Sequence, residues 1–149
     1  MSEHIINLEW HSSPASSENG TYNRNHRVSF SDTAQVPVSS APEYKGDPNC
    51  ADPEKLLTSA LASCHMLTFL AIAELKGFQV ESYLDRATGF LEKGDNGRPV
   101  LSRIELRPKI VFGGENQPDA AAIERLHASA HRNCFIANSI KAKVEVLAA

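Results

Sequence analysis

The longest hydrophobic segment of the chain predicts a single helix over residues 53–76. Asp52 suits the N-cap position, Glu54 lies in the first turn, where the helix dipole favours an anion, and Gly77 suits the position that ends the helix. From residue 56 to residue 75 the segment is apolar around much of its circumference, and such a helix must be covered on most sides. A chain of 149 residues has little material for that, so we expect a partner subunit.

Short alternating segments precede this helix and predict strands. Residues 5–10 form a short predicted strand, and a polar loop is predicted at residues 12–20. Residues 27–30 and 35–38 carry strand-forming side chains on either side of a turn, which predicts a hairpin. Pro37 places the second arm of this hairpin at a sheet edge or near a bulge, because proline cannot donate a ladder hydrogen bond.

Strand patterns and a second helix follow the long helix. The predicted elements are a strand over residues 80–93, a turn at 94–97, a strand over 101–112, a helix over 118–131, a short helix within 133–139 and a strand over 141–146. Strands that are grouped in hairpins, with two separate helices, indicate an α+β fold with mainly antiparallel sheet.

Composition and charge narrow the class of protein. With 42% hydrophobic and 22% charged residues, the chain fits one globular domain over residues 1–149. The formal net charge is -3 and the basic residues do not cluster, so we expect no nucleic-acid partner. The longest apolar stretch, residues 60–73, contains His65 and is too short to cross a bilayer. With no secretory signal in view, we expect a cytoplasmic protein without a membrane partner.

Two cysteines lie in helical contexts 70 residues apart. Cys64 is in the middle of the long predicted helix, and Cys134 follows the second one. Either could be an inert thiol, because free cysteine packs as a small hydrophobe. If the fold brings them together, one thiol could attack an oxidant and be released as a disulfide with the other. A reactive Cys64 needs a nearby cation, because burial raises a thiol pKa and the helix dipole acts only near the helix end. Cys50, in a loop, is interpreted as a bystander.

Glu54 and Cys64 cannot touch along one continuous helix. They are ten residues apart, which is ~15 Å at the rise of an α-helix. Helix capping alone accounts for Glu54. The two residues could share a site only through a bridging group or across a two-fold dimer interface.

A metal site is the alternative chemistry. His127 and His131 have i, i+4 spacing and Cys134 follows three residues later, which is the best set of metal ligands in the chain. The sequence has no Gly-rich phosphate loop, nucleophile elbow or nucleotide fingerprint, and we expect no cofactor.

Both cysteine segments resemble those of one family. Residues 52–57, Asp-Pro-Glu-Lys-Leu-Leu, followed by Cys64 ten residues after Glu54, resemble the N-P-E-E-L stretch and first cysteine of the OsmC/Ohr proteins, the osmotically inducible and organic hydroperoxide resistance proteins. Cys134 lies where that family has C-P-[VI]-[SY]-x-x-[IL] before a terminal strand, although Phe135 replaces the proline. The resemblance covers nearly the whole chain in its order of elements.

The resemblance implies an intertwined homodimer in which antiparallel sheets wrap two long central helices, with active sites at the dimer interface. It also implies a thiol-dependent peroxidase for organic hydroperoxides, reduced by a lipoyl-type dithiol. Cys64 would be the peroxidatic thiolate and Cys134 the resolving thiol, while Glu54 would orient an arginine against the Cys64 sulfur. Arg24 is assigned as that arginine from its place near the first hairpin.

An apolar pocket is expected to favour alkyl hydroperoxides over hydrogen peroxide, with a lining that includes Leu61, Met66, Phe69 and Phe135. Two other functions stay open from the sequence. One is a non-catalytic stress-response dimer with incidental thiols, and the other is the metal-binding protein described above.

Overall fold

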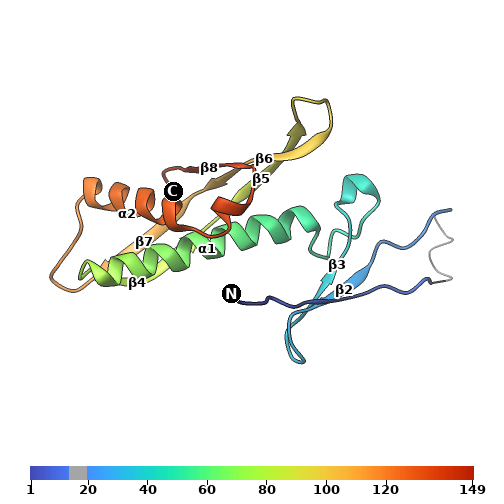
Figure 1. Cartoon of the computed structure of the whole chain (residues 1–149), viewed down its shortest axis with the longest axis horizontal. Helices are drawn as coiled ribbons and strands as arrows, with labels where there is room; N and C mark the ends of the chain where they lie inside the picture. The colour runs from blue at the N-terminus through green and yellow to red at the C-terminus, as the bar shows by residue number, and fades with distance from the viewer. Residues whose placement is uncertain (14–19) are drawn as a thin grey trace. The chain divides into compact units, whose positions relative to one another are not determined.

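The computed structural model describes residues 1–13 and 20–149 of the chain. They form two compact units, Met1–Leu56 and Leu57–Ala149, which are coloured along the chain in Figure 1. The predicted polar loop at residues 12–20 falls largely outside the described residues. That residues 1–149 are one domain stays a prediction.

The first unit contains a three-stranded antiparallel sheet in the order β1-β2-β3. Its elements are β1 (Asn7–Glu9), β2 (His26–Ser29), β3 (Gln35–Val38) and the short 3-10 helix η2 (Pro42–Tyr44). The predicted hairpin is therefore confirmed. Pro37 lies in β3, which is an outer strand of this sheet, as expected of a residue without an N–H.

The long helix α1 (Pro53–Leu75) begins and ends where the sequence predicts within one residue. Its N-cap is Asp52, whose Oδ1 accepts the Lys55 N–H at 2.8 Å. The helix is followed by Gly77 with φ 79°, a left-handed conformation that glycine adopts without strain. The cap and the terminating glycine therefore set the length of α1.

By length and composition α1 is long and apolar enough to cross a membrane, with 23 residues and a mean hydropathy of 1.8. The sequence-based statement that the apolar run is too short for this is therefore wrong. The core helix of a soluble protein meets the same criteria of length and composition. Leu61, His65, Phe69 and Ala73 recur every four residues on α1 and are all buried, as on the inner face of a core helix.

Each of the two long strands predicted after α1 is divided. The strand predicted over residues 80–93 is β4 (Gln79–Asp85) and β5 (Thr88–Lys93), and the strand predicted over 101–112 is β6 (Pro99–Leu106) and β7 (Pro108–Gly113). β4 pairs with β7 in one sheet, and β5 pairs with β6 in another.

Proline and an aspartate explain the division. Pro108 has no N–H for a ladder bond. The N–H of Arg107, just before it, donates to Asp85 Oδ1 at 2.7 Å instead of to a strand carbonyl. The predicted turn between β5 and β6 is confirmed, with Gly97 at φ 77° and the Gly94 N–H donating to the Arg98 carbonyl at 2.8 Å.

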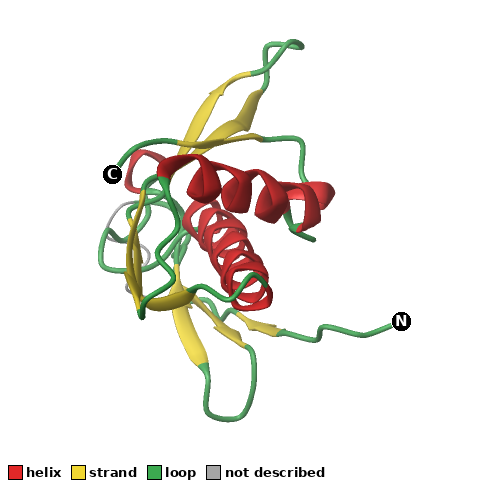
Figure 2. Cartoon of the chain, turned by 90° about the vertical axis from the view of Figure 1, so that its left-hand side faces the viewer, coloured by secondary structure: helices red, strands yellow, loops and turns green. Residues whose placement is uncertain are grey.

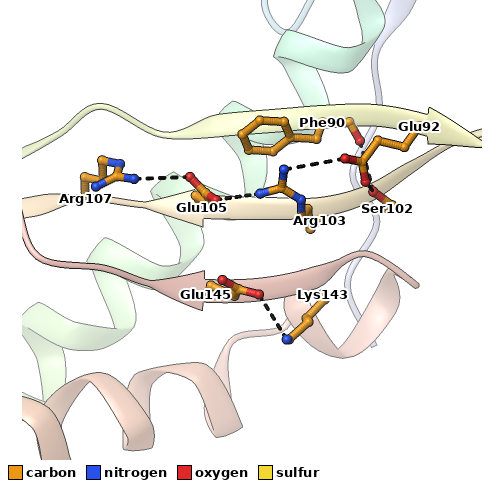
Figure 3. Close-up of polar contacts among 8 residues, drawn as sticks. All are labelled: Phe90, Glu92, Ser102, Arg103, Glu105, Arg107, Lys143 and Glu145. Atoms are coloured by element: carbon orange, nitrogen blue, oxygen red, sulfur yellow. Dashed lines mark hydrogen bonds and ion pairs between the residues drawn. The ribbon is translucent and has the colours of Figure 1, made fainter.

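The last strand, β8 (Lys143–Val146), pairs with β6 in parallel orientation, so the sheets are not wholly antiparallel. One face of the β5-β6-β8 sheet carries charged side chains, as Figure 3 shows. Arg103 pairs with Glu105 at 2.5 Å and with Glu92 at 3.5 Å. Ile104 and Leu106, which alternate with these residues on β6, are fully buried. Alternation of this kind places one face of the sheet in water and the other on the core.

The helix α2 (Ala120–Asn133) begins two residues later than predicted, because Asp119 is its N-cap and accepts the Ala122 N–H at 2.7 Å. It is followed by the short 3-10 helix η3 (Ala137–Ser139). Both helices are red in Figure 2.

Two core clusters line α1 in the second unit. In one, Phe69 and Ala73 of α1 pack with Leu126 and Ala130 of α2, against partly buried residues of β4 and β7. In the other, Leu61 of α1 packs with residues of β6 and with Cys134; Cys64 and Ile136 lie against it. The second cluster is where α1 meets the end of α2.

Candidate thiol site

The fold brings Cys64 and Cys134 together. Cys64 lies half-buried midway along α1, and Cys134 is the fully buried C-cap residue of α2. The two thiols hydrogen-bond to each other and are free rather than bridged, as is Cys50 in the first unit. Burial, and next the charge of Asp47, raise the pKa of the Cys50 thiol.

The surroundings of Cys64 favour its thiolate. Burial opposes ionisation and is the largest single influence on the thiol. Hydrogen bonds from the Ile136 N–H, the Cys134 thiol, the Phe135 N–H and Thr68 together outweigh it, so the pKa of Cys64 lies below that of an ordinary thiol. Hydrogen bonds to a charged acceptor stabilise the charged form. These donors can therefore stabilise the Cys64 thiolate in place of the cation that the sequence predicts.

The surroundings of Cys134 favour its neutral thiol. Burial raises the pKa of Cys134, and the hydrogen bond to Cys64 raises it further. The Ala137 N–H, 3.4 Å from Cys134 Sγ, acts in the opposite direction but does not reverse the shift. Cys64 is therefore the thiol that ionises first, and Cys134 the thiol that keeps its proton.

A tight turn after α2 carries the N–H groups of Phe135 and Ile136. Cys134 is extended, with φ -73° and ψ 116°, so the chain leaves the helix axis there. The Asn138 N–H donates to the Cys134 carbonyl at 3.1 Å, and Ser139 Oγ donates to the Phe135 carbonyl at 2.7 Å. Sequence reasoning missed these donors because it searched for charged side chains. The available signal was a residue with an N–H directly after Cys134.

Glu54 and Arg24 were the other predicted site residues. Glu54 is half-buried in the first turn of α1. Arg24 lies in the first unit, where its Nη1 donates to Thr21 Oγ1 at 2.9 Å and to the Tyr22 carbonyl. Its guanidinium also lies 3.7 Å from the centroid of the Tyr22 ring. The roles of Glu54 and Arg24 at the thiol stay predictions.

The three metal ligands that the sequence suggested, His127, His131 and Cys134, do not form one metal site. His127 Nδ1 lies 3.0 Å from Nε2 of the buried His65, His131 is exposed, and Cys134 faces Cys64. Residues 1–13 and 20–149 contain no group of three or more His, Cys, Asp or Glu side chains that could hold a metal ion.

The expected substrate pocket is also not formed as predicted. Leu61 and Phe69 are both fully buried, in separate core clusters, so they cannot line one open pocket. Phe135 is 81% exposed, so its ring does not pack in the core. The prediction was wrong because both Leu61 and Phe69 lie on the face of α1 that packs inside the second unit.

Comparisons of the sequence and of the structure with known proteins point to one family. The sequence model of the family described as OsmC-like protein matches residues 46–147. An OsmC-like protein of unknown function from Vibrio cholerae is 35% identical, with 100% of both chains covered and a TM-score of 0.93. The uncharacterized protein YmaD of Bacillus subtilis is 26% identical over 110 residues, 73% of each chain.

An organic hydroperoxide resistance protein from Elizabethkingia anophelis shares the fold, with a TM-score of 0.69 at 18% identity and coverage of 97% of this chain and 94% of the other. The resemblance stated from the two cysteine segments is thus confirmed, as is an α+β fold with two helices and antiparallel sheets. On the match of the family model and the similarity to the Vibrio cholerae protein, the chain belongs to the OsmC-like protein family.

Proposed function

We propose that this protein is a thiol-dependent peroxidase that reduces organic hydroperoxides through Cys64 and Cys134. The observation that carries the proposal is the hydrogen bond between two thiols whose pKa values are displaced in opposite directions. A lone buried cysteine is ordinary packing. A half-exposed thiol of lowered pKa beside a second thiol is the arrangement of a reactive cysteine with its resolving partner.

The reaction begins at the Cys64 thiolate. The sulfur attacks the distal oxygen of ROOH, so that an S–O bond forms and the O–O bond breaks. The sulfur loses two electrons and becomes a sulfenic acid, while RO⁻ leaves and takes a proton to become ROH.

The second step is disulfide formation. The Cys134 sulfur displaces hydroxide from the Cys64 sulfenic acid, an S–S bond forms, and water is released once the hydroxide is protonated. An external dithiol of the lipoyl type then attacks the disulfide and restores both thiols by exchange. The hydroperoxide preference is supported by the shared fold with the Elizabethkingia anophelis resistance protein.

A homodimer is part of the proposal. Leu67 and Leu75 of α1 are 59% and 86% exposed, and they lie eight residues apart, on one face of the helix. A second copy of the chain would cover this face. Such a dimer is also the setting in which Glu54 could orient Arg24 beside a Cys64 sulfur that it cannot reach along its own helix.

Stopped-flow oxidation with cumene hydroperoxide tests the proposal. Wild-type protein should react fast and lose two thiols per equivalent of peroxide, whereas Cys64→Ser should not react. Cys50→Ser is the matched control and should behave as wild type. Equal, slow rates for wild type and Cys64→Ser would contradict the proposal, as would full retention of both thiols after one equivalent of peroxide.

A further inference from the structure

A groove outside the thiol site lies in the second unit, between the C-terminal end of α1 and one face of α2. Its volume is about 530 Å³, and nine residues line it. Volumes of this size are typical of sites for small molecules. A stable protein interface takes about 20–30 residues on each side, so the groove suits a small ligand better than a protein partner.

The floor of the groove is apolar and held in place. Ile72 and Leu126 line it and belong to the core cluster that α1 and α2 share. Phe78 also lines it, and its N–H donates to the Ala73 carbonyl at 2.9 Å, as in a chain that reverses after a helix. The Phe78 ring contacts that of Phe112, with centroids 6.4 Å apart. A floor formed in advance can bury a hydrocarbon chain with little ordering of the protein.

Three cations line the same groove, and no acidic side chain is among the nine residues that line it. The cations are Lys76, Arg125 and Arg132, all of them exposed. None takes part in an ion pair within residues 1–13 and 20–149. Because the whole chain has a formal net charge of -3, this local positive charge does not follow from composition.

Helix dipoles account for only part of this charge. Lys76 follows the end of α1, and Arg132 lies in the last turn of α2, where the helix end favours cations. Arg125 lies in the middle of α2, out of reach of either end of that helix. It is seven residues before Arg132, so the two arginines share one face of α2, about 10 Å apart along its axis. This placement is explained if both face a common anion.

We propose that this groove binds a single-chain amphipathic anion, such as a fatty-acid carboxylate, with its chain on the apolar floor and its head on Arg125 and Arg132. The paired N–H groups of arginine match the two oxygens of a carboxylate. The groove is separate from the thiols, because its floor belongs to one core cluster and Cys64 and Cys134 to the other. The proposal therefore adds a ligand site and does not depend on the peroxidase function.

Displacement of a dansyl-labelled undecanoate from the full chain, below the critical micelle concentration, measures binding. Laurate should displace the probe from the wild-type protein. Dodecanol, which has the same chain without the charge, should bind at least about fivefold more weakly. Added salt should weaken the binding of laurate and not that of dodecanol. No displacement by laurate, or equal affinity for laurate and dodecanol, would overturn the proposal.

Variants locate the site in the groove. Arg125→Gln combined with Arg132→Gln should weaken laurate binding about tenfold and leave dodecanol binding unchanged. Arg98→Gln, at an exposed arginine outside the groove, is the matched control and should bind laurate as wild type does. Ala122→Trp, which fills the groove, should block both ligands. Equal laurate affinity in wild type and the double variant would overturn the proposal, even where Ala122→Trp does not fold.

Other occupants of the groove give different results. If a membrane surface were the partner, vesicles of anionic phospholipid would bind the protein while laurate failed to displace the probe. If a second copy of the chain filled the groove, the double arginine variant would have a lower molar mass by light scattering and an unchanged affinity for laurate. Either result would overturn the proposal. Because the assay uses no peroxide, a protein that fails to reduce cumene hydroperoxide refutes the peroxidase and not the ligand site.

Discussion

Acid should destabilise this protein through a buried pair of histidines at the contact between α1 and α2. His65 is 1% exposed, and its Nε2 lies 3.0 Å from Nδ1 of His127. The two rings stack with centroids 5.3 Å apart and an interplanar angle of 11°. His65 Nδ1 is buried with no hydrogen-bond partner in the described part of the chain. A proton added there would have no acceptor, so the folded state holds His65 neutral.

The size of the effect follows from the pKa of His65. Burial, and then the charges of His127 and His131, lower this pKa from 6.5 to about 4. The unfolded chain therefore takes up the proton at a higher pH than the folded chain. The stability contribution is fully present above about pH 6.5 and is lost as the pH falls toward 4. Integrated from pH 7.5 to pH 5, the loss is about 2 kcal/mol.

Other titrating groups do not hide the loss of stability that is expected between pH 7.5 and pH 5. The carboxyl groups of Glu9 and Glu92 have lowered pKa values, with ordinary values of 4.5, so their stabilisation is lost only below about pH 5. Burial raises the pKa of Asp85, which acts in the opposite direction. Burial also lowers the pKa of His127, which adds to the loss from His65.

Urea unfolding followed by far-ultraviolet circular dichroism, at one protein concentration, measures the effect. We expect the free energy of unfolding to fall by about 2 kcal/mol from pH 7.5 to pH 5 in wild type. His65→Gln keeps an amide near the Nε2 position and should remove most of this dependence. His4→Gln, at an exposed histidine, is the control and should retain it. The reasoning is refuted if wild type is equally stable at both pH values, or if His65→Gln shows the full loss.

Three further predictions address the packing, the helix cap and the resolving thiol. Gly89→Ala places a Cβ inside van der Waals contact of Thr58 Oγ1 and should cost about 1–3 kcal/mol in urea unfolding, with partial recovery when Thr58→Ala is added; no loss would contradict the close approach. Asp119→Ala removes the α2 cap and should cost about 1 kcal/mol in the same assay, whereas an unchanged midpoint would show that the cap contributes nothing. Cys134→Ser should leave Cys64 as a sulfenic acid that dimedone traps after one equivalent of cumene hydroperoxide, and absence of the adduct in mass spectra would argue against Cys134 as the resolving thiol.

Local signals were sufficient to predict the elements but not how the strands divide between sheets. Asp52 and Gly77 bound α1 because capping and a left-handed glycine are short-range effects. The division between β6 and β7 depends on the Asp85 carboxylate reaching the Arg107 N–H, 22 residues away. No local sequence signal near Asp85 or Arg107 predicts this contact. The sequence therefore predicted two continuous strands that pair as one hairpin.

The sequence predicted which two cysteines form the thiol site, but not what shifts their pKa values. The two cysteines stand out in the sequence because each lies in a helical context. The largest influence that lowers the pKa of Cys64 is a hydrogen bond from the Ile136 N–H, and every residue except proline supplies an N–H. Only the geometry of the turn after Cys134 distinguishes the N–H groups of Phe135 and Ile136 from any others. The pocket prediction failed for a related reason, because apolar residues on α1 do not reveal which face is inside.

The packing of α1 on α2 links the acid-sensitive histidines to the thiols. Cys64 and His65 are neighbours on α1, and Cys134 and His127 both belong to α2, with Cys134 as its C-cap. The same helix contact therefore places His65 on His127 and Cys64 against Cys134. Protonation of the His65–His127 pair introduces a charge that this contact cannot accommodate. It should loosen the contact and draw the two sulfurs apart, so disulfide formation should slow as the pH falls toward 4, more steeply in wild type than in His65→Gln.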